Sequence, residues 1–272
     1  MAAAIPPSTN VENTLEIKTV QASTFKQVID ALKEILMDVN LEFDETGMKV
    51  VALDNTHVVL VHLKLEADRF EKYYCEKRLY VGINMLKLHL LIKTISNNDV
   101  LTIFVEGNDQ NHLGIQIENP DKNMKTVYKL SMLDINVLNI NIPPADFQTV
   151  ITMPSVDFQK IIRDMHNLAD FIEIRNVGNQ ITFSCKGDFC SQDTILGTEK
   201  NTTISITKNA ENEHEIIQGL FSLKYLSTFT KCTNLSNVVE IYIKNTYPLI
   251  LCYQVANLGM IKLCLAQSEN AA

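Results

Sequence analysis

A short stretch near position 50 brings together residue types that can do chemistry. The segment ALDNTHVVLVHLKL, residues 52–65, holds Asp54, His57 and His62 among apolar residues, and such side chains bind zinc or act in acid–base catalysis. After His57 almost every residue is β-branched or aliphatic, which predicts a strand, and the Asp-Asn-Thr triplet before it predicts a turn. Because the two histidines are five positions apart, one strand would point them to opposite faces, so they would not share a metal ion.

Other arrangements that could support catalysis lack the required spacing. Asp54 with Asp44 or Glu45 forms no metal-binding pattern, and the sequence has no glycine-rich phosphate loop and no Ser-His-Asp arrangement. Of six cysteines the closest pair is Cys185 and Cys190, which is not a zinc-knuckle spacing. We therefore expect no catalytic residue, no metal site and no cofactor, and a metal-dependent nuclease is kept only as the enzyme alternative.

Length and composition bound the class of protein. The chain has 272 residues, 46% hydrophobic and 21% charged, with a net charge of −8. That allows one large or two ordinary domains, and the acidic surface as a whole does not favour nucleic acid. Since no signal peptide and no apolar run of about 18 residues is visible, we expect an intracellular protein with free thiols.

Four weak sequence matches indicate a duplicated unit. They occur in the same order at offsets of 131 to 138 residues, which predicts two similar halves of mixed α and β structure. The matched pairs are FKQVID with FQKIIR, LEFDETGMKVV with IEIRNVGNQIT, LKLHLLIK with LKYLSTFTK, and VLTIFV with VVEIYI.

Each half is expected to contain two amphipathic helices and several strands. Apolar spacing predicts helices over residues 22–36, 84–95, 155–167 and 222–231, with Ser155 as an N-cap. Gly47 and Gly178 predict hairpin turns. The expected boundaries are a disordered extension at 1–13, a first domain at 14–131, an extended connector at 132–148, a second domain at 149–268 and a tail at 269–272.

The charge of these helices is opposite to that of the whole chain. They carry eight basic and four acidic residues, a net charge of +4 against −8 for the chain. If the helices cover one face of a sheet, their cations form a track that binds phosphates without reading sequence; the alternative is an ordinary solvated helix face. The basic residues are Lys26, Lys33, Lys87, Lys93, Lys160, Arg163, Lys224 and Lys231.

Several segments taken in order resemble the proliferating cell nuclear antigen (PCNA) family of sliding clamps, from about Leu15 to Gln267. They are FDETGMKVVALDNTHVVLVHLKL, FEKYYCEKRLYVGIN, IPPADF, MPSVDFQKIIRDM, YLSTFTK and YPLILCYQVANLGMIKLCLA. The resemblance implies an α+β fold with two clamp domains per chain, with antiparallel sheets outside and four helices inside. It also implies a homotrimeric ring through which duplex DNA passes, and a processivity factor for replication and repair enzymes rather than an enzyme.

The resemblance further implies a hydrophobic pocket that binds partner peptides, with His57 as a packing and hydrogen-bonding wall. The alternative is that these residues are simply core. Ring contacts are implied at the edges formed by about 123–131 and 189–197. The residues that match the pocket are Leu53, His57, Val58, Leu60, Ile140, Ile142, Pro248, Cys264 and Ala266.

Partners and location follow from the same resemblance. The implied partners are duplex DNA, DNA polymerase, a clamp loader and other proteins with a PCNA-interacting peptide, and no membrane is implied. The implied location is the nucleus, or a viral replication compartment if the source is a large DNA virus. The alternative function is a monomeric or dimeric processivity factor that does not form a ring.

Some residues depart from the pattern of the family. Leu90, Thr152 and Asn167 stand where relatives often carry a basic residue or histidine, so DNA contacts are expected to be sparser. Cys264 replaces a usual aromatic residue, which predicts either a wider pocket or a preference for different peptide anchors. The loop at 176–180 has no lysine, which puts ubiquitin-type regulation there in doubt.

Overall fold

The computed structural model describes residues 12–137, 140, 146–147, 149–197, 203–208 and 215–268. Residues 1–11, much of the connector and the tail at 269–272 therefore lie outside the described residues, together with the expectations made for them. Within the described residues the chain forms two halves of nine strands each, and the two halves follow the same order of strand pairing. The duplication expected from the weak sequence matches is thus present in the fold.

The elements follow one another in corresponding order in the two halves. The first half contains β1 (Asn13–Thr19), α1 (Ala22–Leu32), β2 (Asp38–Asp44), β3 (Gly47–Leu53), β4 (Val59–Glu66), the 3₁₀ helix η1 (Ala67–Arg69), β5 (Lys72–Cys75), β6 (Leu79–Asn84), α2 (Met85–Ile92), β7 (Val100–Glu106), β8 (Asp109–Asn119) and β9 (Met124–Ser131). The second half contains β10 (Thr149–Pro154), α3 (Ser155–His166), β11 (Phe171–Val177), β12 (Gln180–Lys186), β13 (Ser191–Gly197), β14 (Ser205–Lys208), β15 (Ile217–Ser222), α4 (Leu223–Phe229), the 3₁₀ helix η3 (Thr230–Asn234), β16 (Val238–Ile243), β17 (Leu249–Val255) and β18 (Gly259–Leu265).

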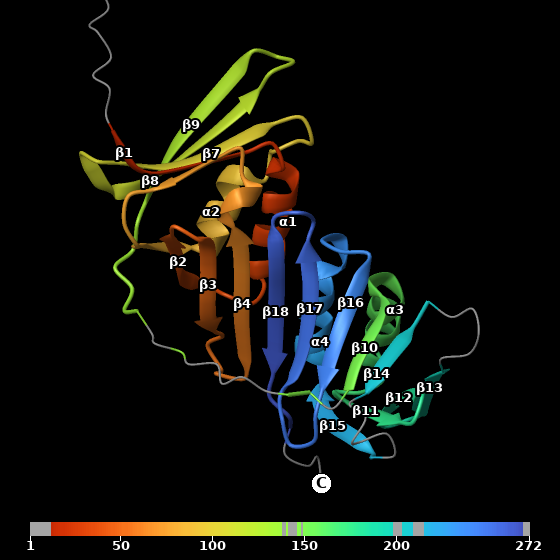
Figure 1. The fold of residues 1–272 in the computed structure, drawn as a ribbon. Coiled ribbons are helices and arrows are strands. Elements are labelled where there is room, and N and C mark those ends of the chain that lie inside the picture. Colours follow the sequence, from red (N-terminus) through yellow and green to blue (C-terminus); the bar gives the residue numbers. More distant parts are fainter. Residues whose placement is uncertain are drawn as a thin grey trace, which may run out of the picture.

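One sheet runs through both halves. Its order is β14-β10-β16-β17-β18-β4-β3-β2-β6, and the two halves meet where β18 pairs with β4 from Gly259↔Leu65 to Leu265↔Val59. Figure 1 shows this sheet crossing the molecule, with the sheet β5-β1-β7-β8-β9 at one end and the sheet β13-β12-β11-β15 at the other. All strand pairs between named strands are antiparallel in the described part of the chain.

Alternating side chains explain why these segments are strands. In β4 the residues Val59, Val61, Leu63 and Leu65 are fully buried, while the residues between them are half-buried on the other face. This period of two gives each strand one core face and one outer face. The hairpin turns contain the expected glycines, because Gly47 and Gly178 have φ angles of 142° and 55° that other residues rarely adopt.

The four helices form one layer on one side of the nine-stranded sheet, as Figure 1 shows. Helix α1 contacts α2 and η3, while α3 contacts α4 and η3. The helices of the two halves therefore pack against each other in one layer. They end earlier than expected: α1 stops at Leu32, where the bond from Ile35 N to Leu32 O tightens the last turn. Asn84 lies outside α2 as its N-cap and accepts a hydrogen bond from Lys87 N at 3.0 Å.

The expected N-cap at Ser155 is wrong. Helix α3 begins at Ser155 itself, and Pro154 occupies the capping position. The backbone N–H of Ser155 donates to Asn237 O at 2.9 Å, while its hydroxyl is buried without a hydrogen-bond partner among the described residues. Strand β10 continues up to Pro154, which pairs with Val238. The strand therefore runs directly into α3, and its last residue is also the residue at the N-cap position.

The connector between the halves is attached to the sheet at both of its ends. Leu133 N donates to Gly82 O at 2.8 Å, and Asn40 Nδ2 donates to Ile135 O at 3.0 Å. Gly82 allows this approach, because a Cβ atom there would lie 2.1 Å from Leu133 O. At the other end the ring of Phe147 packs edge-on against Tyr242, with ring centroids 5.4 Å apart.

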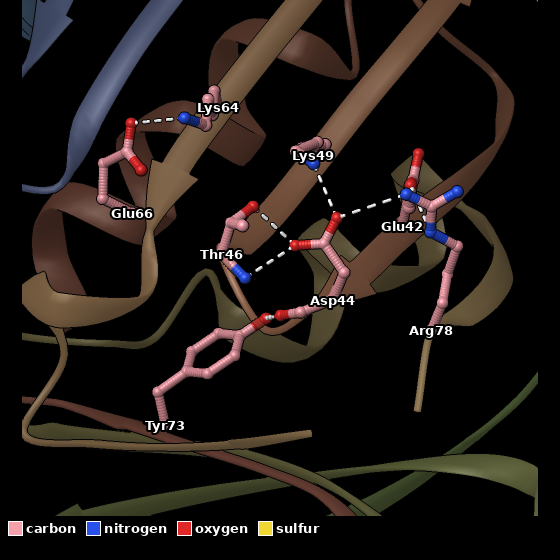
Figure 2. Close-up of polar contacts among 8 residues, drawn as sticks. All are labelled: Glu42, Asp44, Thr46, Lys49, Lys64, Glu66, Tyr73 and Arg78. Atoms are coloured by element: carbon pink, nitrogen blue, oxygen red, sulfur yellow. Dashed lines mark hydrogen bonds and ion pairs between the residues drawn. The ribbon is translucent and has the colours of Figure 1, made fainter. Parts of the chain in front are cut away.

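A charged network holds the β2–β3 hairpin. Figure 2 shows the Asp44 carboxylate between Lys49 and Arg78, with Thr46 on its second oxygen. Lys49 Nζ lies 2.6 Å from Asp44, Arg78 Nη2 lies 3.7 Å away, and Thr46 N donates at 2.7 Å. Burial acts to raise the pKa of Asp44, but the hydrogen bonds from Lys49 and Thr46 outweigh it and hold the pKa well below its usual range.

This network makes a pH-dependent contribution to stability. A carboxylate whose pKa is lower in the folded state stabilises the fold above its unfolded pKa, and the contribution is lost as pH falls toward the folded value. We expect Asp44→Asn to lower the free energy of unfolding at pH 7 by about 1–3 kcal/mol. The gap to the unaltered chain should narrow below about pH 4. Urea unfolding at several pH values measures this, and a gap that is constant from pH 7 to pH 3 would contradict it.

Candidate functional site

The helix layer exposes most of the basic residues singled out in the sequence. Lys87, Lys93, Lys160, Arg163, Lys224 and Lys231 are exposed, and they come from α2, α3, α4 and η3 or from the residue that follows α2. Their acidic neighbours are few, although Arg163 Nε lies 3.5 Å from Asp164. Leu86 and Leu90 are also exposed on α2, by 57% and 50%. Two positions on the exposed side of this helix are therefore apolar rather than basic.

The two basic residues of α1 differ from the rest. Lys26 is half-buried, and its ammonium group donates to Ile95 O at 3.1 Å. Lys33 Nζ lies 3.4 Å from Asp30 and 3.1 Å from His89 Nε2. Both cations thus have protein partners, which reduces what they can offer to an external anion.

The turn before β4 is organised by Asp54. Its carboxylate accepts hydrogen bonds from Val58 N at 2.9 Å and from Val59 N at 2.8 Å, and Thr56 donates to its other oxygen. Burial acts to raise the pKa of Asp54, and the hydrogen bonds, led by that of Thr56, lower it below its usual range. His57 lies in this turn with a φ angle of 59° and is exposed. His57 therefore precedes β4, the strand that contains His62, and the strand begins after His57 as expected.

The same turn contacts the helix layer. Thr56 Oγ1 and the hydroxyl of Tyr225 on α4 are 2.9 Å apart. The ammonium group of Lys224 lies 5.8 Å from the centroid of the Tyr225 ring. A polar contact therefore joins the turn of the first half to a helix of the second half, and nothing in the spacing of these residues indicated it.

An apolar row crosses the outer face of the nine-stranded sheet, on the side away from the helices. Strand register places half-buried side chains opposite one another on six adjacent strands. Three expected pocket residues belong to this row, and three further members were missed because only strand register places them there. In order, the members are Leu53, Leu60, Cys264, Ile250, Tyr242 and Val150.

A hollow of about 420 Å³ lies beside the start of this row. The connector forms one wall through Ile135, Val137 and Ile140, and the outer faces of β2, β3 and β6 form the floor. Leu53 belongs both to the row and to the hollow. The described connector residues thus border a depression of mixed lining, in which Asp38, Glu42 and Arg78 accompany the apolar side chains.

The remaining expected pocket residues lie around this row to different degrees. Val58 and Pro248 are half-buried, and Ala266 N donates to Val58 O at 3.1 Å, which holds the chain after β18 next to the turn. Ile142 lies outside the described residues. The structure therefore brings together the residues from β3, β4 and β18, whereas the connector contributes Ile140 alone among those expected.

Titratable groups on this face are set up for packing rather than for chemistry. Burial raises the pKa of Cys264 to about 11, so its thiol is protonated at neutral pH. Burial lowers the pKa of His62, and Lys262, Lys64 and Lys49 lower it further. Among the described residues no group of three His, Cys, Asp or Glu side chains could hold a metal ion. None of the helices described combines the length and apolar character that a membrane crossing requires.

Comparison with known proteins assigns both halves to one family. The model for the proliferating cell nuclear antigen N-terminal domain matches residues 14–139, and the model for its C-terminal domain matches residues 141–268. The chain is 37% identical over 254 residues to the probable DNA polymerase sliding clamp 1 of Paramecium bursaria Chlorella virus 1, covering 92% of this chain and 95% of the viral protein. It is 31% identical over 252 residues to the proliferating cell nuclear antigen of Chaetomium thermophilum, covering 93% and 97%.

Proposed function

Since the chain belongs to the proliferating cell nuclear antigen family and is a DNA sliding clamp, we propose that three copies close head to tail into a ring around duplex DNA. In this ring the clamp acts without catalysis and holds DNA polymerase and other replication and repair proteins through peptides that bind the apolar row. It receives DNA through a clamp loader, in the nucleus or in a viral replication compartment. The observation that supports the ring most directly is the β18–β4 pairing within one chain.

This pairing supplies a template for the contact between subunits. In the duplicated fold β9 occupies the place of β18, and β13 occupies the place of β4. Strands β9 and β13 are both at sheet edges, where no described strand pairs with their second side. An unpaired edge tends to pair with another chain, and a head-to-tail contact of this kind closes into a ring when its rotation allows.

The template also gives the register. The last residue pair before the turn shows which positions correspond in the two halves. In the hairpins β8–β9 and β17–β18 it makes Met124 equivalent to Gly259, and in β11–β12 and β2–β3 it makes Gln180 equivalent to Gly47. Because Ile261 is opposite Leu63 inside the chain, Thr126 of one subunit is expected opposite Thr194 of the next. Both of these threonines are half-buried, while their neighbours along each strand are exposed.

The same register brings an aromatic anchor to a hollow. Tyr128 of β9 would lie opposite Gln192, which lines a hollow of about 330 Å³ between α3 and β13. Ile161 and Leu196 supply apolar surface there. A tyrosine in such a hollow buries its ring and leaves its hydroxyl near polar groups, as aromatic residues at interfaces do.

Cysteine cross-linking tests the ring and its register. We expect the chain with Thr126→Cys and Thr194→Cys to form disulfide-linked dimers and trimers under mild oxidation, because opposed strand residues have Cβ atoms about 4.5–5.5 Å apart. Denaturing gels before and after dithiothreitol measure this. The control is Thr126→Cys with Gln192→Cys, which is two residues out of register. A monomeric mass at micromolar concentration, or equal cross-linking in both variants, would refute the ring as proposed.

The exposed cations are expected to set retention on DNA. Changing Lys93, Lys160 and Lys231 together to alanine should shorten retention on circular DNA and flatten the salt dependence, by about 0.9 in log–log slope for each phosphate that is no longer neutralised. The matched control changes Arg69, Lys77 and Lys122, which are exposed outside the helix layer. Retention times from 50 to 200 mM salt compare the two, and equal effects in both variants would argue against a basic track.

The peptide pocket has a separate test. Ile140→Ser with His57→Ala should weaken binding of a labelled helical peptide, with a leucine and two aromatic residues on one face, by about tenfold or more. Fluorescence anisotropy measures it. Lys64→Ala with Met260→Ser alters the same sheet face away from the apolar row and should leave binding unchanged. Normal binding by the first variant would mean that the pocket lies elsewhere.

A further inference from the structure

A hollow larger than the one beside the connector lies in the second half, away from the apolar row. Its volume is about 860 Å³, and its lining comes from the end of α3, from β11, β12, β13 and β15, and from the loops between them. Strand register places its floor residues Leu220, Glu173, Ser184 and Asp193 opposite one another across four strands. The hollow therefore lies on the outer face of the four-stranded sheet.

The duplicated fold gives this hollow a counterpart in the first half. Strands β11, β12 and β15 occupy the places of β2, β3 and β6, which form the floor of the hollow beside the connector. Glu173 pairs with Leu220 as Asn40 pairs with Gly82. The two hollows thus lie at equivalent positions in the two halves.

The chain leaves each half in the same way. After β9 the connector bonds to the sheet through Leu133 N and Gly82 O at 2.8 Å, and after β18 the chain bonds through Ser268 N and Leu220 O at 2.9 Å. The connector then continues as a wall of the first hollow. In the second half the lining residues all come from the domain itself, and no residue from the chain after β18 is among them within the described range.

The second hollow differs from the first in its charge. Asp170, Glu173, Asp188 and Asp193 line it, against one lysine, Lys186. No ion pair involves any of these four carboxylates among the described residues. Leu168, Leu220 and Phe171 add apolar surface, so the lining suits side chains with an aliphatic stem and a cationic head.

We propose that this hollow is a second peptide-binding site, which takes an extended, lysine- or arginine-bearing segment of a partner protein. The peptide would lie where the connector lies in the first half, with its cations facing the carboxylates. DNA is disfavoured as the occupant because its phosphates would meet four negative side chains. The chain's own next residues are disfavoured as well, because they begin with Glu269.

Such a site would act together with the apolar row of the same subunit. A partner whose pocket-binding peptide is followed or preceded by a basic segment gains a second contact at high effective concentration. The second contact would be sensitive to salt, because the hollow is open to solvent. The existence of the second site does not depend on the first, so the two can be tested separately.

A cationic probe peptide tests the site. The probe is a fluorescein-labelled peptide that alternates lysine and threonine, measured by anisotropy at low ionic strength. We expect the unaltered clamp to bind it, and Glu173→Gln with Asp193→Asn to weaken binding by about tenfold, as the removal of two solvent-accessible charge pairs implies. The matched control, Asp68→Asn with Glu76→Gln, removes the same charge elsewhere and should bind as the unaltered clamp does. A glutamate–threonine peptide should not bind.

Several outcomes would overturn the proposal. They are no binding by the unaltered clamp, an equal decrease in both charge variants, or loss of binding in Ile140→Ser with His57→Ala, which would place the probe in the connector pocket. A chain ended at Ser268 that binds about tenfold tighter would identify its own tail as the occupant. Matching thermal unfolding curves for all variants exclude misfolding as the cause of any difference.

Discussion

The pairing of β18 with β4 is the constraint on which the rest of the structure depends. Seven residue pairs, from Gly259↔Leu65 to Leu265↔Val59, join the last strand of the chain to the fourth. This pairing makes one sheet from two duplicated halves, brings their helices into one layer, and completes the apolar row across both halves. It also pairs β18 with β4, whereas their counterparts in the duplication, β9 and β13, stay at sheet edges.

The two faces of this sheet carry different properties, and the separation follows from the period of two in each strand. One face packs under the helices, whose exposed cations lie in an otherwise acidic chain. The other face carries half-buried aliphatic and aromatic side chains and the connector. The hydrogen bond between Thr56, in the turn before β4, and Tyr225, on α4, joins the sheet to the helix layer. In the function proposed above, DNA and partner peptides bind opposite faces of the same subunit and do not compete for surface.

The sequence predicted what depends on local pattern and missed what depends on pairing between distant strands. Apolar spacing predicted the helices, the glycines at 47 and 178 predicted the hairpins, and four sequence matches at similar offsets predicted the duplication. The helix ends were wrong because the last turns tighten, as at Leu32 of α1, and the role of Ser155 was wrong because β10 continues up to Pro154. Ile250 and Tyr242 become neighbours of Leu60 and Cys264 only through strand register. The acidic hollow could not be predicted either, because its floor is formed by residues from four paired strands.

The close approach at Gly82 has a consequence for how this family can vary. A side chain there would clash with the carbonyl oxygen of Leu133, because its Cβ would lie 2.1 Å from that atom. A substitution would thus lift the start of the connector while β6 keeps its partner β2. The wall formed by Ile135, Val137 and Ile140 would move with it, so this one glycine fixes the shape of the hollow beside the apolar row.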